Sequence, residues 1–357
     1  MKKITIVGCG SVGFIHAYFF AQKGFEISFL KTSDYNSTYF NKVKEDKLFS
    51  VMDRNSEIKE IKFNKITTRP EEVIPEAEII LIATTTLQHE KVAEKIASFL
   101  TDNQIICIMP SYASSLIFKK YIKNKKIKFV EFETTLFNGR IIENSYININ
   151  FKNCRMAAYF DGFSKEEIEN FSSNIFPISK EAKNTFEIAF HNPNMIVHTI
   201  GVLLSASRIE FAQGEFWMYK EAFTPSIIKV IQAFDREKNN ILKALGCQEL
   251  TYFDAAKWRN EEDLSQDSLK VFKSFAEDSN KGPAQLRHRY LLEDVPMGLN
   301  LFKSVGKVLG IETKIAEAII VLSSNLLEED FILNGRNLNN IFGRECTFND
   351  LYKISNI

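Results

Sequence analysis

The chain has 357 residues, 45% hydrophobic and 25% charged, a length that makes two domains the expectation. Its 45 basic and 45 acidic side chains balance, so no long-range field attracts nucleic acid or an anionic membrane, and small-molecule partners are favoured. The five cysteines never form CxxC, which argues against a disulfide framework and a zinc site. No apolar run reaches the roughly 18 residues of a membrane span. We therefore expect a soluble, cytoplasmic protein without a metal.

The first predicted element is a buried strand, ITIV at 4–7, followed by the glycine turn GCGSVG and an apolar helix that ends at Gly24. The first glycine permits the tight turn, the second lets the backbone approach a pyrophosphate, and the third lets helix and strand pack closely. The helix start then offers free N–H groups to phosphates. A lone glycine motif can be a plain turn, but this context predicts dinucleotide binding by Gly8, Gly10, Ser11, Val12 and Gly13.

Further apolar runs alternate with helical segments along the first half of the chain. This alternation predicts an α/β domain of the Rossmann type with a doubly wound parallel sheet. Thr84 lies at the end of one of the strands and is expected at the carboxyl edge of the sheet, where cofactor and substrate meet. The predicted strands are FEISFL at 25–30, EIILIATTT at 78–86, QIICIMP at 104–110 and IKFVEFETT at 127–135, with a helix in HEKVAEKIASFL at 89–100.

The end of the second strand bears on the choice of cofactor. An NAD enzyme commonly has an acidic residue there for the ribose 2′-hydroxyl, whereas this chain has Lys31, Thr32 and Ser33. A cation and two hydroxyls suit a 2′-phosphate, so NADP(H) is favoured over NAD(H). The alternative is that Lys31 is an ordinary exposed lysine and that Asp34 binds the ribose.

From about residue 186 the apolar residues recur at three- and four-residue spacing, which predicts an all-α domain. We expect a dinucleotide-binding domain over 1–185 and a helical substrate domain over 186–357. No repeat or low-complexity linker separates them, so a substantial interface is expected. The sequence leaves a homodimer open. The helical runs are NMIVHTIGVLLSASRIEFA, SIIKVIQAFDREKNNILKALG, DSLKVFKSFAED and TKIAEAIIVLSSNLL.

Several motifs in this order resemble the octopine/opine dehydrogenase family across essentially the whole chain. After the glycine turn come FVEFETTLFNGR, NPNMIVHTIGVLLSASRIE, FWMYKEAFTPSIIKVIQAFDREKNNILKALG and RYLLEDVPMGL. They are similar to the family's Glu-Thr stretch ending in Arg, its Asn-Pro-x3-His helix, its aromatic and Thr-Pro segment, and its Arg-Tyr-x2-Glu-Asp-Val-Pro signature. The chain departs from the family's Leu-Pro-Tyr at 136–138 and has Thr199 where Pro commonly follows the histidine.

The resemblance implies a Rossmann domain joined to a helical domain, a layout like that of 6-phosphogluconate dehydrogenase, with the active site in the cleft between them. It also implies reductive condensation of an amino acid's amino group with an α-keto acid such as pyruvate, using NADH or NADPH. The product is an N-(carboxyalkyl) amino acid. The substrates are therefore small molecules.

Two histidines, His191 and His198, lie close together in HNPNMIVHTIG. Asn192 and Pro193 suit a helix start, so His198 is expected in the second turn and His191 before the cap. A metal pair is disfavoured because the two are seven residues apart with no third ligand nearby. A satisfied core histidine is the stronger alternative on local pattern alone. Matching the family motif selects His198 as the catalytic acid/base.

The resemblance supplies partners for His198. Asp294 is implied to accept a hydrogen bond from the imidazole and to stabilise the imidazolium, and Arg289 to bind a substrate carboxylate with its planar guanidinium. On local pattern alone, this stretch could equally be a solvated helix end closed by Pro296. Glu133 and Thr134 match the Glu-Thr pair and are candidate substrate contacts. Arg140 is a second candidate carboxylate anchor, although an arginine after a strand is more often simply exposed.

Two other functions are compatible with this sequence. The first is reduction of a preformed ketone, as in ketopantoate reductases, whose layout is similar and whose acid is a lysine. The second is a non-catalytic NADP(H)-binding sensor. A sensor has no need for a histidine, an arginine and an aspartate together, which favours an opine-type dehydrogenase.

Overall fold

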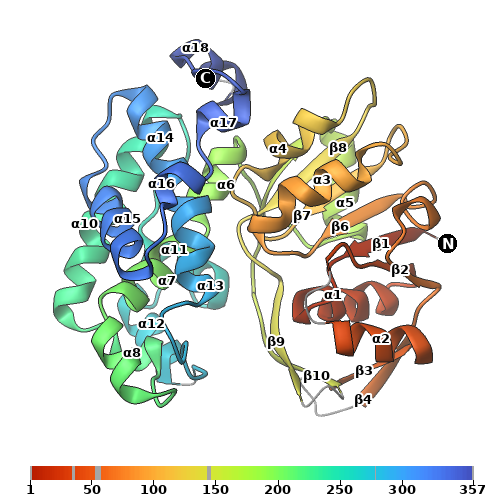
Figure 1. Cartoon of the computed structure of the whole chain (residues 1–357), viewed down its shortest axis with the longest axis horizontal. Coiled ribbons are helices and arrows are strands. Elements are labelled where there is room, and N and C mark those ends of the chain that lie inside the picture. The colour runs from red at the N-terminus through yellow and green to blue at the C-terminus, as the bar shows by residue number, and fades with distance from the viewer. Residues whose placement is uncertain (1, 34–36, 53–57, 143–145, 278, 356–357) are drawn as a thin grey trace. The chain divides into compact units, whose positions relative to one another are not determined.

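The computed structural model describes residues 2–33, 37–52, 58–142, 146–277 and 279–355 (Figure 1). By its contacts the chain divides into two units, Met1–Glu181 and Ala182–Ile357. The division falls before Asn184, whose Oδ1 accepts hydrogen bonds at 3.1 Å from the N–H groups of Phe186 and Glu187. These bonds cap helix α6 (Thr185–His191), so the cap stays with its helix.

The N-terminal unit contains an eight-stranded sheet in the order β12-β11-β8-β7-β6-β1-β2-β5. Neighbouring strands are parallel except β11, which runs antiparallel to β8. Alternate residues of β6 enter different cores: Ile79 and Leu81 join one, Ile80 and Ile82 the other. The doubly wound α/β prediction is confirmed. The strands are β1 (Lys3–Val7), β2 (Glu26–Leu30), β5 (Lys65–Thr67), β6 (Ile79–Ile82), β7 (Ile105–Ile108), β8 (Lys128–Phe132), β11 (Ala157–Asp161) and β12 (Lys180–Glu181).

Helices cover both faces of this sheet. Helix α1 (Ser11–Gln22) supplies Phe14 to one core, and α5 (Lys165–Asn174) supplies Phe171 to the same core. Helices α3 (His89–Ala97) and α4 (Ser114–Tyr121) bury apolar side chains in the other core. The remaining helical segments are α2 (Ser37–Asp46) and the short η1 (Pro70–Glu72) and η2 (Thr86–Gln88).

A second sheet, which the sequence did not lead us to expect, packs against α1. Its order is β4-β3-β10-β9. The Phe14 ring of α1 stacks on Phe49 of this sheet at 4.4 Å and lies 4.8 Å from Phe29 of β2, so phenylalanine rings join the two sheets. Arg140 belongs to this sheet. The strands are β3 (Leu48–Met52), β4 (Ile58–Lys62), β9 (Phe137–Ile142) and β10 (Tyr146–Lys152).

The C-terminal unit is helical, as predicted. The expected run from Asn194 to Ala212 is two helices, α7 (Asn194–Leu203) and α8 (Ala206–Ala212). Almost all of α7 is buried, and it packs against α10, α13 and α15. The other helices are α9 (Met218–Glu221), α10 (Pro225–Ala244), α11 (Tyr252–Asn260), α12 (Ser268–Glu277), α13 (Arg289–Leu292), α14 (Asn300–Leu309), α15 (Lys314–Leu327), α16 (Phe331–Asn334), α17 (Leu338–Phe342) and α18 (Phe348–Ser355).

A π-helical turn, η3 (Val295–Leu299), links α13 to α14. Pro296 stands in the first turn of η3, where the N–H that proline lacks is not needed. The helical path therefore continues past Pro296, and the alternative of a helix end closed by this proline is wrong. Wide turns of this kind are frequent at functional sites, and Asp294 immediately precedes this one.

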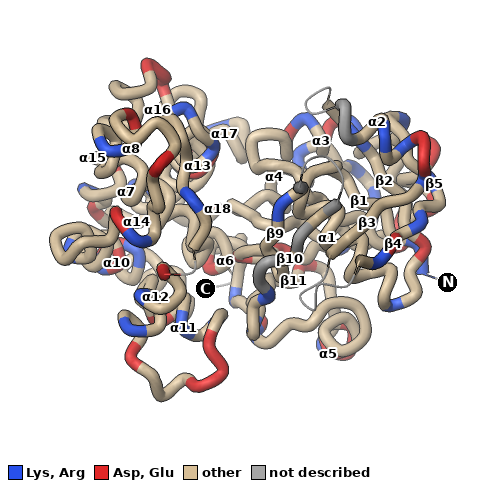
Figure 2. The backbone as a smooth tube through the Cα atoms, turned by 90° about the horizontal axis from the view of Figure 1, so that it is seen from below, with Lys and Arg blue, Asp and Glu red and all other residues tan. Residues whose placement is uncertain are grey.

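Basic and acidic residues are interspersed over both units, in agreement with the balanced composition (Figure 2). Among the described residues, no single helix is long and apolar enough to cross a membrane. Two consecutive helical segments, Thr185–Leu203 and Ala206–Ala212, have together the length and composition of a membrane span, but they are bent by 69° relative to each other.

Candidate active site

The glycine turn after β1 has the geometry that dinucleotide binding requires. Gly8 has φ +115°, and a Cβ there would lie 2.8 Å from the Ala83 carbonyl oxygen. A Cβ on Gly13 would collide with the Gly8 carbonyl oxygen and lie 3.2 Å from the Phe29 ring. A Cβ on Gly10, in contrast, would meet nothing within 4 Å. Two of the glycines thus serve internal packing, and Gly10 leaves open space in front of the start of α1.

Thr84 lies against this turn, because β1 and β6 are neighbours in the sheet. A Cβ on Gly8 would be 3.0 Å from Thr84 Cγ2. The Thr84 hydroxyl is buried and makes no hydrogen bond to the part of the chain that the structure describes. A buried hydroxyl without a protein partner beside the glycine turn fits a site that a bound nucleotide completes.

Lys31 lies at the end of β2, beside the same turn. It is buried, with an exposed fraction of 6%, and its ammonium donates to the Ser33 carbonyl oxygen and lies 5.8 Å from the centre of the Phe40 ring. The alternative of an ordinary exposed lysine is wrong. Burial raises the pKa of the Cys9 thiol to about 12, and the nearby Lys31 charge opposes that rise. Lys31 therefore places positive charge at the glycine turn. Asp34, the alternative ribose ligand, lies outside the described residues.

Two glutamates, Glu131 and Glu133, lie two positions apart at the end of β8. Glu131 is fully buried and accepts hydrogen bonds from the Ser111 and Ser115 hydroxyls and, at 2.9 Å, from the Ser114 N–H. It thereby binds the start of α4 to the sheet, a role that the sequence reasoning missed. An acidic residue within the otherwise mostly apolar run IKFVEF was the available signal. Glu133, two residues later, is 3% exposed, and Thr134 beside it is half-buried.

In the helical unit, His198 of α7 meets Asp294 at the start of η3. The imidazole Nδ1 lies 2.8 Å from Asp294 Oδ2, and the side chains are 7% and 5% exposed. This pair is 96 residues apart in the chain. Since a carboxylate only accepts, Nδ1 carries the proton in this contact, and Nε2 is the basic nitrogen of the neutral ring. The geometry is that of a histidine oriented by an aspartate.

His191 has a different environment. It is the last residue of α6, and its Nε2 lies 2.9 Å from the Gln248 carbonyl oxygen. Helix α7 begins at Asn194, one residue later than expected, although Asn192 Oδ1 still accepts the Asn194 N–H at 3.1 Å. Among the described residues, no group of three or more His, Cys, Asp or Glu side chains is placed to hold a metal ion.

Arg289 and Tyr290 belong to the short helix α13, which packs against α7. The Arg289 side chain is exposed, and its guanidinium carbon lies 5.7 Å from the centre of the Tyr290 ring. The Tyr290 ring stacks on the His198 imidazole with centroids 3.5 Å apart and planes at 13°. The sequence reasoning did not single out Tyr290, since no local pattern marks a ring that meets a distant helix.

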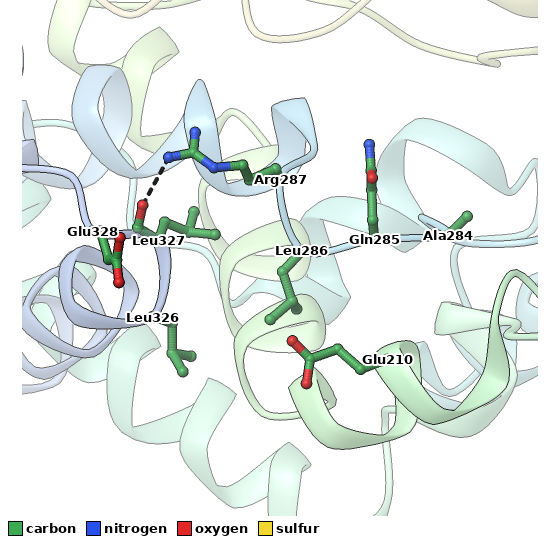
Figure 3. A pocket seen from close by; sticks show the side chains of 8 residues that line it. All are labelled: Glu210, Ala284, Gln285, Leu286, Arg287, Leu326, Leu327 and Glu328. Carbon is green, nitrogen blue, oxygen red and sulfur yellow. Dashed lines mark hydrogen bonds between the residues drawn. The ribbon is translucent and has the colours of Figure 1, made fainter.

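Two further features are Arg140, in the N-terminal unit, and a pocket in the helical unit. In β9, the exposed Arg140 guanidinium donates to Asn138 Oδ1 and to the Gly139 carbonyl oxygen, both at 3.1 Å. An open pocket of about 440 Å³ in the helical unit contains none of the predicted site residues (Figure 3). Arg287, which donates to the Leu327 carbonyl oxygen, forms part of its wall with Glu210, Ala284, Gln285, Leu286, Leu326, Leu327 and Glu328.

Comparison with known proteins gives two family matches. Residues 181–327 match the model described as NAD/NADP octopine/nopaline dehydrogenase, alpha-helical domain, and residues 4–129 match the model described as Ketopantoate reductase PanE/ApbA. The chain is 26% identical to the vitopine synthase of Allorhizobium ampelinum, with 75% of each chain covered. It is 24% identical to the opine dehydrogenase of Arthrobacter sp. strain 1C, with 94% of each covered.

Solved structures show the same fold. An octopine dehydrogenase determined with NADH and L-arginine superposes with a TM-score of 0.75 at 17% identity, over 100% of this chain and 98% of that one. The helical-domain match, the two relatives and the shared fold agree with the motifs found in the sequence. The chain belongs to the octopine/opine dehydrogenase family and is an NAD(P)-dependent oxidoreductase that acts on the CH–NH group.

Proposed function

We propose that this enzyme condenses the amino group of an amino acid with a pyruvate-like α-keto acid and reduces the product with NADPH. The result is an N-(carboxyalkyl) amino acid. The observation that carries the proposal is the buried His198–Asp294 pair, with Nδ1 and Oδ2 2.8 Å apart, on the family's helical domain. An acid/base of this kind suits proton transfer to a carbonyl and from an amine.

The proposed role of His198 follows from its contacts. Asp294 accepts from Nδ1, so Nε2 of the neutral ring can take protons from the attacking amino group and pass them to the carbonyl oxygen. The ammonium of the amino acid gives up two protons in all, the oxygen takes both and leaves as water, and the C=N nitrogen stays protonated for hydride addition. Asp294 stabilises the imidazolium in the meantime. The nicotinamide cofactor supplies the hydride when bound. No proton has to cross from Asp294 for this sequence of steps.

The other side chains bind rather than react. We assign a substrate carboxylate to Arg289, whose exposed planar guanidinium can donate two parallel hydrogen bonds. Glu133 and Thr134 are assigned to the ammonium of the amino acid and the oxygen of the keto acid. Arg140 is kept as a second carboxylate anchor, although its guanidinium already donates to Asn138 and Gly139.

The test is NADPH oxidation with pyruvate and a panel of amino acids, followed by the mass of the product. Turnover that requires both substrates, with a product that contains both skeletons, is the expected result. Turnover of the keto acid alone would overturn the proposal in favour of a ketone reductase. NADPH binding without turnover on any pair would favour a redox sensor instead.

Ketone reduction is the second candidate, because residues 4–129 match the ketopantoate reductase model. That match covers only the nucleotide-binding part of the chain, which both chemistries share. The two functions differ in their acid: ketone reduction in the manner of ketopantoate reductases would depend on a lysine and survive loss of His198. Activity on ketopantoate that survives His198→Ala would decide for it.

We propose that NADP(H) is preferred over NAD(H), with Gly8, Gly10, Ser11, Val12, Gly13 and Thr84 at the dinucleotide and Lys31, Thr32 and Ser33 at the 2′-phosphate. The support is the Lys31 charge beside the glycine turn. Lys31→Ala should weaken the binding of NADPH at least about fivefold more than the binding of NADH, since only NADPH has the extra phosphate. Lys3→Ala, at the opposite end of β1, is the control. An unchanged NADPH/NADH ratio in Lys31→Ala would remove this assignment.

A cytoplasmic location is also proposed. All five cysteines are thiols rather than disulfides, and Cys107, Cys247 and Cys346 are buried, as suits a reducing compartment. Cell fractionation tests the location. Light scattering at several concentrations tests the homodimer, and an unchanging monomer mass would exclude it.

A further inference from the structure

We infer that Tyr290 is a positioning residue for His198. The Tyr290 ring holds the catalytic imidazole in one plane. The inference rests on the proposed function of His198. The two rings are nearly parallel, with centroids 3.5 Å apart and an interplanar angle of 13°. His198 is 5% exposed and Tyr290 is half-buried, so the stacked face of the imidazole is closed to solvent and to substrate.

The stack and the carboxylate constrain different motions of the imidazole. Asp294 binds Nδ1 from the edge of the ring at 2.8 Å. Tyr290 covers one face. A rotation that exchanges the two edges of the imidazole must sweep the ring out of its plane, and the Tyr290 ring occupies that space on one side. The two contacts together keep Nε2 pointing in one direction.

Tyr290 is itself held by His288. The His288 Nδ1 accepts the Tyr290 N–H at 3.4 Å, and the two rings meet edge-to-face at 4.5 Å and 88°. The start of α13 is thereby fixed against the ring that it presents to α7. Edge-to-face and offset stacked rings are favourable beyond the area that they bury. His288, Tyr290, His198 and Asp294 form a continuous chain of contacts in the helical unit.

The ring of Tyr290, and not its hydroxyl, is the active part of this arrangement. Tyr290→Phe keeps the ring and drops the hydroxyl, whereas Tyr290→Leu removes the ring. We expect Tyr290→Leu to lower kcat about 10- to 100-fold with KM values changed less than about threefold, because a misdirected acid/base impairs chemistry more than binding. Tyr290→Phe should stay within about threefold of the parent enzyme.

Nuclear magnetic resonance tests the contact without relying on turnover. The chain has five histidines, and His198→Ala identifies the His198 signals in protein with labelled histidine. In Tyr290→Leu the His198 ring protons should move downfield, because the ring current of the stacked tyrosine is lost. Tyr290→Phe should keep the parent positions. Tyr352→Leu, an exposed residue of α18, is the matched control and should leave these signals in place.

The outcomes separate the inference from the proposed function. Unchanged His198 signals in Tyr290→Leu would overturn the inference, as would a Tyr290→Phe variant that loses as much kcat as Tyr290→Leu. If the His198 signals change in Tyr290→Leu but the parent enzyme does not condense an amino acid with a keto acid, the stacking contact stands and the proposed function is wrong. Thermal melting checks the fold of each variant, and Tyr290→Met replaces Tyr290→Leu if the latter unfolds.

Discussion

His198 Nδ1 lies 2.8 Å from Asp294 Oδ2, with both side chains almost completely buried. A buried carboxylate in this position determines which ring nitrogen carries the proton and stabilises the charge that the ring acquires. The contact joins the fifth residue of α7 to the residue before the π-helical turn. The proposed mechanism depends on this contact more than on any other.

Asp294→Asn should lower kcat at least about a hundredfold, because an amide can donate to the imidazole and so leave the wrong nitrogen protonated. Cofactor affinity should not change, since the glycine turn belongs to the other unit. Steady-state kinetics and fluorescence titration with NADPH measure the two effects. Asp330→Asn, which removes the charge but keeps the acceptor oxygen of an exposed helix cap of α16, is the control. A kcat within about threefold of the parent value in Asp294→Asn would contradict the assignment.

The two histidines near the start of α7 should behave differently. His198→Ala should abolish turnover and leave NADPH binding intact. His191→Ala should retain turnover and lose about 1 kcal/mol of stability, because its Nε2 contact with the Gln248 carbonyl oxygen only joins two segments. Kinetics with thermal melting distinguishes the two. Retained turnover in His198→Ala would remove the mechanism, and equal loss in both variants would point to a joint role.

Substitutions of Gly10 and Gly13 should have different effects. Gly10→Ala should melt near the parent temperature but bind NADPH at least about tenfold more weakly, because its methyl group would fill only the space in front of the helix. Gly13→Ala should instead lower the free energy of unfolding by about 1–3 kcal/mol, because its methyl group would collide with the Gly8 carbonyl oxygen. Melting and binding assays check both. Unimpaired NADPH binding by Gly10→Ala would contradict the predicted pyrophosphate site.

His16 should make the N-terminal unit sensitive to acid. Burial lowers the pKa of this imidazole from its ordinary value of 6.5 to about 4, while its Nδ1 contacts the Val12 carbonyl oxygen at 2.7 Å. Between these values the unfolded chain binds a proton and the folded chain does not, so stability falls as the pH falls through this window. The loss at pH 4 should be roughly 3 kcal/mol.

Urea unfolding followed by circular dichroism at pH 7 and pH 4 measures this loss. In His16→Asn the contribution of the imidazole is absent, so the free energy of unfolding should differ less between pH 7 and pH 4 than it does in the parent protein. Equal acid sensitivity in the parent and His16→Asn would show that other groups account for it.

Local patterns predicted the elements of the nucleotide-binding unit well. Buried parallel strands are continuous apolar runs, so β1, β2, β6, β7 and β8 were all expected from their sequence. The small sheet was not. β4 reads IKEIK, with polar residues at most positions, and β3 pairs with β10, almost a hundred residues away. Pairing at that distance is decided by packing against α1 rather than by propensity.

The sequence by itself determined the two-unit architecture, the glycine turn and, through the order of its motifs, the family and the choice of His198 over His191. These properties are carried by short segments whose spacing and residue types have direct physical meaning. Only the tertiary structure decided that Thr84 lies against Gly8, that Lys31 is buried, that Glu131 binds the start of α4, and that Tyr290 stacks on His198. Side-chain packing between separate elements sets each of these features, and local sequence patterns do not record it.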